Sequence, residues 1–107
     1  MSFVYLLGNF EQENVYKIGI TRGKIENRIK QLQTGSSGGI YLVNYHKTKY
    51  PFFIEKNFHM KYYPNHVIGE WFELSPEEVL KFKEDCQFFE NNAKILEENA
   101  FAKNILK

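Results

Sequence analysis

The chain has 107 residues and a formal net charge of +1, which suits one domain with a single core and is too short for two. Its one cysteine, Cys86, excludes a disulfide framework within the chain and a zinc site built of thiolates. No stretch approaches the roughly 20 apolar residues that span a bilayer, and Met1-Ser2-Phe3 leads straight into a strand pattern without signal-peptide features. We therefore expect an intracellular protein with no membrane partner.

The charges are unevenly distributed along the chain. Residues 1–65 hold nine Lys or Arg against four Asp or Glu, whereas residues 66–107 hold five against nine. A basic first part favours a phosphate-bearing partner. An acidic, solvated C-terminal helix explains the same asymmetry equally well, so charge alone does not decide between the two interpretations.

Two strands are predicted at the start, Val4–Leu7 and Val15–Thr21, joined by a polar turn over residues 8–14. Such a hairpin brings Tyr5 and Lys17 to the same end of a sheet. A phenol beside an ammonium, with the guanidinium of Arg28 one element later, is an arrangement that can handle a phosphate. Phosphodiester chemistry is therefore the hypothesis to test.

A helix is predicted over Lys24–Gln33, where apolar residues recur at helical spacing. Three glycines in residues 34–39 end it, and a third strand follows over Ile40–Lys47. A second helix begins at Pro51 and runs to about Met60 or Lys61, with Phe52, Glu55 and His59 on one face.

The last third contains a short extended segment, Gly69–Leu74, and a strong helix start. Ser75 fits the N-cap, Pro76 the first helical position, and Glu78 completes a capping box. The helix continues with a stripe of residues expected to be buried, and the tail over residues 91–107 either prolongs it or forms a second helix. The stripe consists of Val79, Phe82, Cys86, Phe89 and Ala93.

These elements predict an α+β fold: a small, mainly antiparallel three-stranded sheet flanked by helices, with a C-terminal helical extension. We expect a core over residues 1–80 and a C-terminal helix or helices over residues 75–107 that pack on it, so that the chain is a single domain overall.

Five motifs in this order resemble the GIY-YIG nuclease superfamily. They are Phe3-Val4-Tyr5, Lys17-Ile18-Gly19-Ile20-Thr21, Arg28, Glu55-Lys56-Asn57-Phe58-His59 and Gly69-Glu70-Trp71-Phe72. Lys-Ile-Gly where the founding motif has Tyr-Ile-Gly is similar to one branch of the superfamily, which is common in phages and large viruses and is often described simply as a DNA-binding domain. The resemblance covers roughly residues 3–80.

The resemblance implies a catalytic role for Tyr5, Lys17, Arg28 and His59. Tyr5 corresponds to the tyrosine that helps to activate the attacking water, and Lys17 is positioned to be the cation that lowers the pKa of its phenol. Arg28 would hold phosphate oxygens through its planar fork. His59, one helical turn after Glu55, would transfer a proton or contact a phosphate.

Glu55 stands where the family supplies its metal-binding carboxylate, which implies one Mg²⁺ or Mn²⁺ ion as the cofactor. Gly19 and Glu70 are expected to support the site. Arg22, Lys24 and Lys30 are candidates for contacts to the DNA backbone. DNA is the expected partner, and the sequence does not exclude RNA.

The sequence departs from the family pattern one turn after Arg28. Nuclease members often carry a histidine there, whereas this chain has Gln31 and Leu32. Three hypotheses therefore stand: a metal-dependent DNA endonuclease, a nucleic-acid-binding module with weak or absent catalysis, and a protein-interaction domain that docks through its acidic C-terminal helix.

Overall fold

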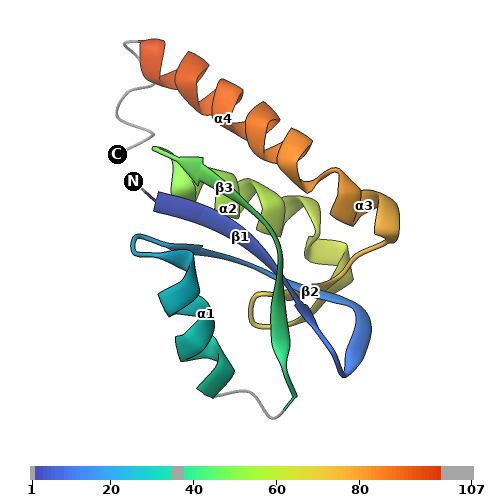
Figure 1. Ribbon diagram of the computed structural model, residues 1–107. Coiled ribbons are helices and arrows are strands. Elements are labelled where there is room, and N and C mark those ends of the chain that lie inside the picture. The colour runs from blue at the N-terminus through green and yellow to red at the C-terminus, as the bar shows by residue number, and fades with distance from the viewer. Residues whose placement is uncertain (1, 35–37, 100–107) are drawn as a thin grey trace.

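The computed structural model describes residues 2–34 and 38–99 and confirms the α+β class. Antiparallel strands form one sheet in the order β3-β1-β2-β5-β4, with α1 on one side and α2 and α4 on the other (Figure 1). The strands are β1 Ser2–Asn9, β2 Gln12–Thr21, β3 Ile40–Thr48, β4 His66–Ile68 and β5 Trp71–Glu73. The helices are α1 Ile25–Thr34, α2 Pro51–Lys61, the 3-10 helix η1 Tyr63–Asn65, α3 Pro76–Leu80 and α4 Phe82–Glu98.

The sheet has five strands rather than the three predicted from the sequence. The two additional strands, β4 and β5, have three residues each and form a hairpin at one edge. Gly69, with φ of +55°, lies in the turn between them, in the left-handed region that glycine adopts without strain. Strands of three residues are too short to show an alternating pattern, which is why the sequence indicated only one extended segment.

The first hairpin is longer than predicted, because most of the expected turn over residues 8–14 is strand. Only Phe10 and Glu11 form the turn, where Oδ1 of Asn9 accepts a hydrogen bond of 2.8 Å from the backbone nitrogen of Glu11. Side chains of the strand ends are exposed and polar, but backbone pairing does not depend on their polarity. The polar composition therefore predicted a longer loop than the chain forms.

Side chains on the two faces of the sheet belong to two separate clusters. Val4, Leu6 and Ile18 pack with α2 and α4 on one face, whereas Tyr5 and Leu7 pack against α1 on the other. The alternation follows from the period of two along a strand. As a result Tyr5 faces α1 and lies on the opposite face from the main core.

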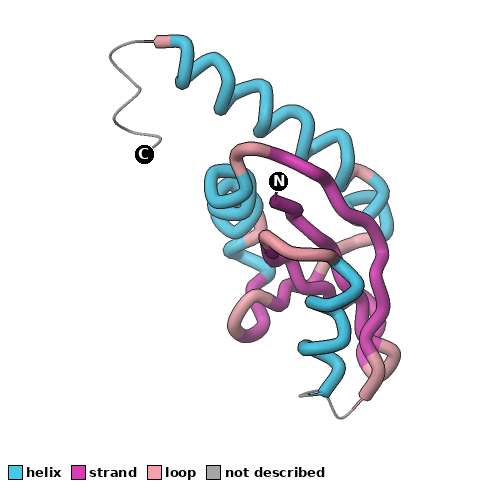
Figure 2. The backbone as a smooth tube through the Cα atoms, turned by 60° about the vertical axis from the view of Figure 1, so that its left-hand side comes forward, coloured by secondary structure: helices cyan, strands magenta, loops and turns pink. Residues whose placement is uncertain are grey.

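The capping box at Ser75 is confirmed: its hydroxyl accepts from the backbone nitrogen of Glu78, and the Glu78 carboxylate accepts from that of Ser75. The single helix expected after it is interrupted at Lys81, which separates α3 from α4 (Figure 2). The part of the predicted tail over residues 100–107 lies outside the described residues.

The apolar stripe of α4 is covered by the chain's own α2. Phe58 of α2 stacks on Phe82 at 5.3 Å between ring centroids and meets Phe89 edge-on at 5.0 Å. Cys86 is fully buried beside them, and burial raises the pKa of its thiol to about 12. The stripe is therefore part of the core, and it does not provide the docking face of the protein-interaction hypothesis.

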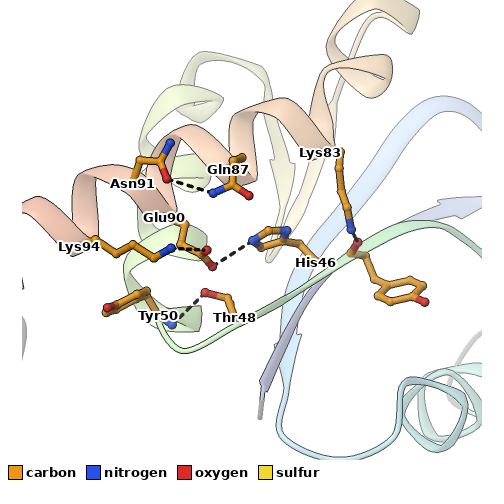
Figure 3. A network of polar contacts seen from close by, with 9 residues as sticks. His46, Thr48, Tyr50, Lys83, Gln87, Glu90, Asn91 and Lys94 are labelled. Carbon is orange, nitrogen blue, oxygen red and sulfur yellow. Dashed lines mark hydrogen bonds and ion pairs between the residues drawn. The ribbon is translucent and has the colours of Figure 1, made fainter.

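A polar network fastens α4 to the edge strand β3 (Figure 3). Nε2 of His46 lies 3.1 Å from Oε1 of Glu90, and Nζ of Lys94 lies 3.4 Å from the other carboxylate oxygen. Burial opposes the charge of Glu90, but hydrogen bonds from Thr48 and His46 outweigh it and lower the pKa of this carboxyl.

Replacing Glu90 with glutamine is expected to lower the stability near pH 7 by about 1–3 kcal/mol, because His46 loses its charged partner. A carboxyl with a depressed pKa stabilises the fold above its unfolded pKa, and this stability is lost as the pH falls through the depressed value. Urea unfolding at pH 7 and below pH 4.5 measures both effects. Glu84→Gln, on an exposed part of the same helix, is the control, and an equal loss in both variants contradicts the prediction.

Among the described residues, none of the helices has both the length and the apolar character needed to cross a membrane.

Candidate functional site

Tyr5 and Gly19 face each other on adjacent strands, and the phenol ring of Tyr5 lies across the glycine. A Cβ atom placed on Gly19 would lie 2.5 Å from the Tyr5 hydroxyl oxygen and 2.6 Å from Cζ, closer than atoms can approach. Only glycine leaves room for this ring. The glycine of the Lys-Ile-Gly motif therefore determines where the Tyr5 hydroxyl lies.

Gly19→Ala is expected to displace the Tyr5 ring and to lower the free energy of unfolding by about 1–3 kcal/mol, the usual cost of overpacking. Urea unfolding gives the free energy, and near-UV circular dichroism reports the tyrosine environment. Gly23→Ala is the matched control, because an added Cβ there meets nothing within 4 Å. Equal stability of the two variants would show that the ring adapts without cost.

Arg28, on α1, is the cation that contacts Tyr5. Its Nε donates a hydrogen bond of 3.4 Å to the Tyr5 hydroxyl, and Nη1 donates one of 3.4 Å to the side-chain oxygen of Gln31. The helix begins immediately after the loop that follows β2, so its first turns lie over the sheet beside Tyr5. The structure thus brings Tyr5, Gly19 and Arg28 together.

The structure gives Tyr5 a different cation as hydrogen-bond partner from the Lys17 that the sequence suggested. Burial raises the pKa of the Tyr5 phenol, and Arg28, not Lys17, provides the contact that partly lowers it. Lys17 faces the same side of the sheet, but it is paired with Leu7 and Trp71, one pleat further along the strands. Its charge acts on the carboxyl of Glu55 and opposes part of the increase that burial causes in the pKa of that group.

Glu55 and His59 come from α2, one helical turn apart. Nε2 of His59 lies 3.0 Å from the carbonyl oxygen of Ile18 in β2, and its ring packs against Phe72 with 5.0 Å between centroids. Because a carbonyl oxygen only accepts, Nε2 carries the hydrogen and the lone pair of the neutral ring is on Nδ1. The bond fixes the ring and leaves that second nitrogen available.

Glu70 completes the group from the turn between β4 and β5. Strand β5 pairs with β2 only as far as Lys17, and the next backbone nitrogen, that of Ile18, donates a 3.2 Å hydrogen bond to the Glu70 carbonyl. The paired part of this edge of β2 thus ends beside α2. Ligand atoms of Glu55, His59 and Glu70 all lie within 4.8 Å of one another, and each side chain is half-buried.

The two carboxyls repel each other in the free protein. Burial is the main cause that raises the pKa of Glu55, and the charge of Glu70 and a hydrogen bond with it add to the increase. His59 and Lys17 act in the opposite direction. Both carboxyls also raise the pKa of Tyr5, which places them close enough to influence the phenol.

The donor set fits a divalent cation. Two carboxylates that disfavour each other's charge gain from a shared positive ion, and Mg²⁺ often takes only one or two protein carboxylates beside waters and phosphate. Mn²⁺ accepts the same oxygen ligands. Glu70 was expected only to support the site, but its carboxylate lies close enough to that of Glu55 to be a second candidate ligand for the same ion. The only sign of this second candidate ligand in the sequence was an acidic residue directly before Trp71 and Phe72.

The three predicted DNA-contacting residues are all exposed, but they do not form one surface. Arg22 lies in the loop before α1 with its guanidinium carbon 5.9 Å from the ring centroid of Phe52. Lys24 lies directly before α1, and both Arg22 and Lys24 line one surface cleft. Lys30 is two residues beyond Arg28, about 200° around the helix, and points to another side.

Residues 2–87 match a family model described as the T5orf172 domain, which covers most of the chain and all the residues of this site. No curated protein and no solved structure matches the chain.

Proposed function

Because the chain belongs to the T5orf172 domain family, which is related to the GIY-YIG nucleases, we propose that it is a DNA endonuclease that hydrolyses phosphodiester bonds with one Mg²⁺ or Mn²⁺ ion. The observation that carries the proposal is the position of the Glu55, His59 and Glu70 cluster beside the Tyr5–Arg28 pair. A metal site next to a phosphate-binding guanidinium is what phosphodiester hydrolysis requires.

Glu55 and Glu70 would hold the cation, which when bound supplies positive charge to the phosphate oxygens. Arg28 binds the scissile phosphate and stabilises the charge that develops on it. Lys17, whose charge already acts on Glu55 across the site, neutralises a neighbouring phosphate oxygen. Gly19 keeps the Tyr5 hydroxyl in place.

Water attacks phosphorus as the bond to the leaving oxygen breaks. The raised pKa of Tyr5 makes its phenol neutral at pH 7, so Tyr5 orients the water instead of deprotonating it. Nδ1 of His59, whose Nε2 is bonded to the carbonyl oxygen of Ile18, takes the proton from the water. A DNA substrate also implies that the protein acts inside the cell.

The second candidate is a DNA-binding module with little or no catalysis. Gln31, which occupies a position where nuclease members often have a histidine, instead accepts a hydrogen bond from Arg28. The raised pKa of Tyr5 argues in the same direction, since a neutral phenol is a poor base. The phosphate-binding residues serve this function equally well.

Nicking of supercoiled plasmid in Mn²⁺, Mg²⁺ or EDTA tests the proposal. Nicking that requires either metal and stops in EDTA supports the endonuclease. Absence of nicking, together with retention of DNA in a gel that weakens steeply as salt is added, supports the binding module. If the chain neither nicks nor retains DNA, both functions are excluded.

A further inference from the structure

A second feature of the α1 face is a cleft of about 490 Å³ between the first turns of α1 and strands β1 and β3. Its walls are apolar or aromatic and consist of Phe3, Ile25, Ile29, Leu42 and Tyr45. Its rim carries three cations and one carboxylate, namely Arg22, Lys24, Lys47 and Glu26. The cleft lies outside the cluster of Glu55, His59 and Glu70.

The aromatic walls offer a surface on which a planar ring can stack. Tyr45 and Phe3 meet edge to face with 5.9 Å between centroids, and Tyr45 is 45% exposed although it lies within a strand. Lys83 of α4 lies over the Tyr45 ring at 5.3 Å from its centroid and adds positive charge to this edge. Exposed aromatic rings flanked by cations are the platforms on which proteins stack unpaired bases.

The composition of the cleft matches the two halves of a nucleotide. An apolar wall suits a base, and a rim with an excess of positive charge suits the phosphates on either side of it. A peptide strand added to the edge of β3 fits less well, because Lys83 already donates to the carbonyl oxygen of Tyr45 that such a strand would use. The observations therefore favour a nucleotide over a peptide.

The cleft is next to the proposed catalytic residues. Tyr45 lies directly opposite Tyr5 in the ladder of β1 and β3, and Phe3 is two residues from Tyr5 on the same face, about 7 Å along the strand. Arg22 lies at the rim and also over Phe52 of α2, one turn before Glu55. If a DNA strand has one phosphate at Arg28, the next nucleotide of that DNA strand can thus reach the cleft.

We propose that this cleft binds an unstacked base of the substrate strand next to the scissile phosphate. The inference rests on the proposed function and narrows its substrate class: DNA with unpaired nucleotides, such as a single strand, a flap or a branch, in preference to an intact duplex. Tyr45 provides the stacking surface, while Arg22, Lys24 and Lys47 neutralise the flanking phosphates.

Fluorescence anisotropy tests the proposal with a labelled single-stranded oligonucleotide and the same sequence as a blunt duplex, both in EDTA so that no cleavage occurs. We expect tighter binding of the single strand. Tyr45→Ala should weaken that binding about 5- to 150-fold, the range of stacking on one aromatic ring, and Tyr45→Phe should restore it. Tyr63→Ala, which removes a 75% exposed tyrosine outside the cleft, should leave it unchanged.

Two further measurements test separately whether a base stacks on Tyr45 and whether Lys47 contacts a phosphate. A 2-aminopurine in the single strand should lose fluorescence on binding the wild-type chain but not Tyr45→Ala, because stacking quenches it. Lys47→Gln should reduce the slope of log K against log salt by about 0.7, the change expected for one phosphate contact on a single strand.

The proposal is overturned if the duplex binds as tightly as the single strand, or if Tyr45→Ala and Tyr63→Ala behave alike. It is also overturned if neither DNA binds, in which case the cleft is open to a protein partner. Failure of the endonuclease gives a different pattern, namely absence of nicking in Mn²⁺ with Tyr45-dependent binding of the single strand intact.

Discussion

Replacement of Glu55 by glutamine is expected to lower metal-dependent nicking at least about 100-fold while the fold is retained. A bound divalent cation is worth several kcal/mol of charge stabilisation in phosphoryl chemistry, and each 1.36 kcal/mol corresponds to a factor of ten in rate. Glutamine keeps the shape of the side chain but removes the charge that attracts the cation. The measurement is the initial rate of plasmid nicking at several concentrations of Mn²⁺.

Glu73→Gln is the matched control for this variant, because Glu73 is an exposed carboxylate on β5 outside the cluster. It should nick at the wild-type rate. A nicking activity that survives in Glu55→Gln but not after further purification comes from a contaminant. Undiminished nicking by the purified variant would falsify the assignment of Glu55.

The proposed metal binding by Glu55 has a second readout that does not depend on activity. Mn²⁺ should raise the melting temperature of the wild-type chain, since a ligand that binds only the folded state stabilises it. The increase should be absent in Glu55→Gln. Glu70→Gln separates the two carboxylates, because a direct ligand reduces the increase whereas a residue that does not touch the ion leaves it unchanged.

The raised pKa of Glu55 also predicts the direction in which the stability of the metal-free chain changes with pH. Its pKa is raised in the folded chain, mainly by burial, so ionisation of this carboxyl opposes folding. The stability of the metal-free wild type should therefore fall as the pH rises from the unfolded pKa of glutamate through the raised value. Glu55→Gln should lack this fall and should be at least as stable as the wild type in EDTA at pH 7.

Replacement of Arg28 by alanine is expected to lower nicking about 100- to 1000-fold, the usual cost of removing one preorganised donor from a developing oxyanion. Hydrogen bonds to Tyr5 and Gln31 hold the Arg28 side chain in place, which would preorganise it for the proposed phosphate contact. The loss should appear in kcat more than in KM if the contact strengthens in the transition state.

Two variants separate the charge of Arg28 from its shape and from the helix. Arg28→Lys keeps the positive charge but loses the planar fork, and we expect an intermediate rate. Asn27→Ala alters an exposed neighbour on the same helix and should leave the rate unchanged. A loss of equal size in Asn27→Ala and Arg28→Ala would point to a damaged helix and not to a lost phosphate contact.

Much of the fold could be predicted from the local pattern of the chain. Pro51 and Lys61 bound the second helix where proline and the break at Tyr62 indicated, and Ser75 and Glu78 form the capping box that their spacing predicted. These features depend on neighbours within a few residues. The sheet edge was missed because β5 gains its place in the sheet from a distant strand, β2, and β4 pairs only with β5.

In the candidate site, too, some features could be predicted from the sequence and others only from the structure. Tyr5, Arg28 and Glu55 were singled out because they stand where motifs that resemble the GIY-YIG superfamily place functional side chains. The partners were not: Arg28 and not Lys17 contacts Tyr5, and Glu70 lies against Glu55. Whether Glu70 reaches Glu55 depends on where β5 stops pairing with β2, and the sequence near either residue does not show this.

The sequence by itself determined the α+β class, the basic first part of the chain and the residue types of the site. The tertiary structure alone decided that Tyr5 is buried with a raised pKa, that two carboxyls share one side of the site, and that Phe3, Tyr45 and Lys47 line a cleft beside it. The physical reason is that alternation along a strand fixes the face of each side chain, while burial, charge and contact are set by elements that meet only when the sheet assembles.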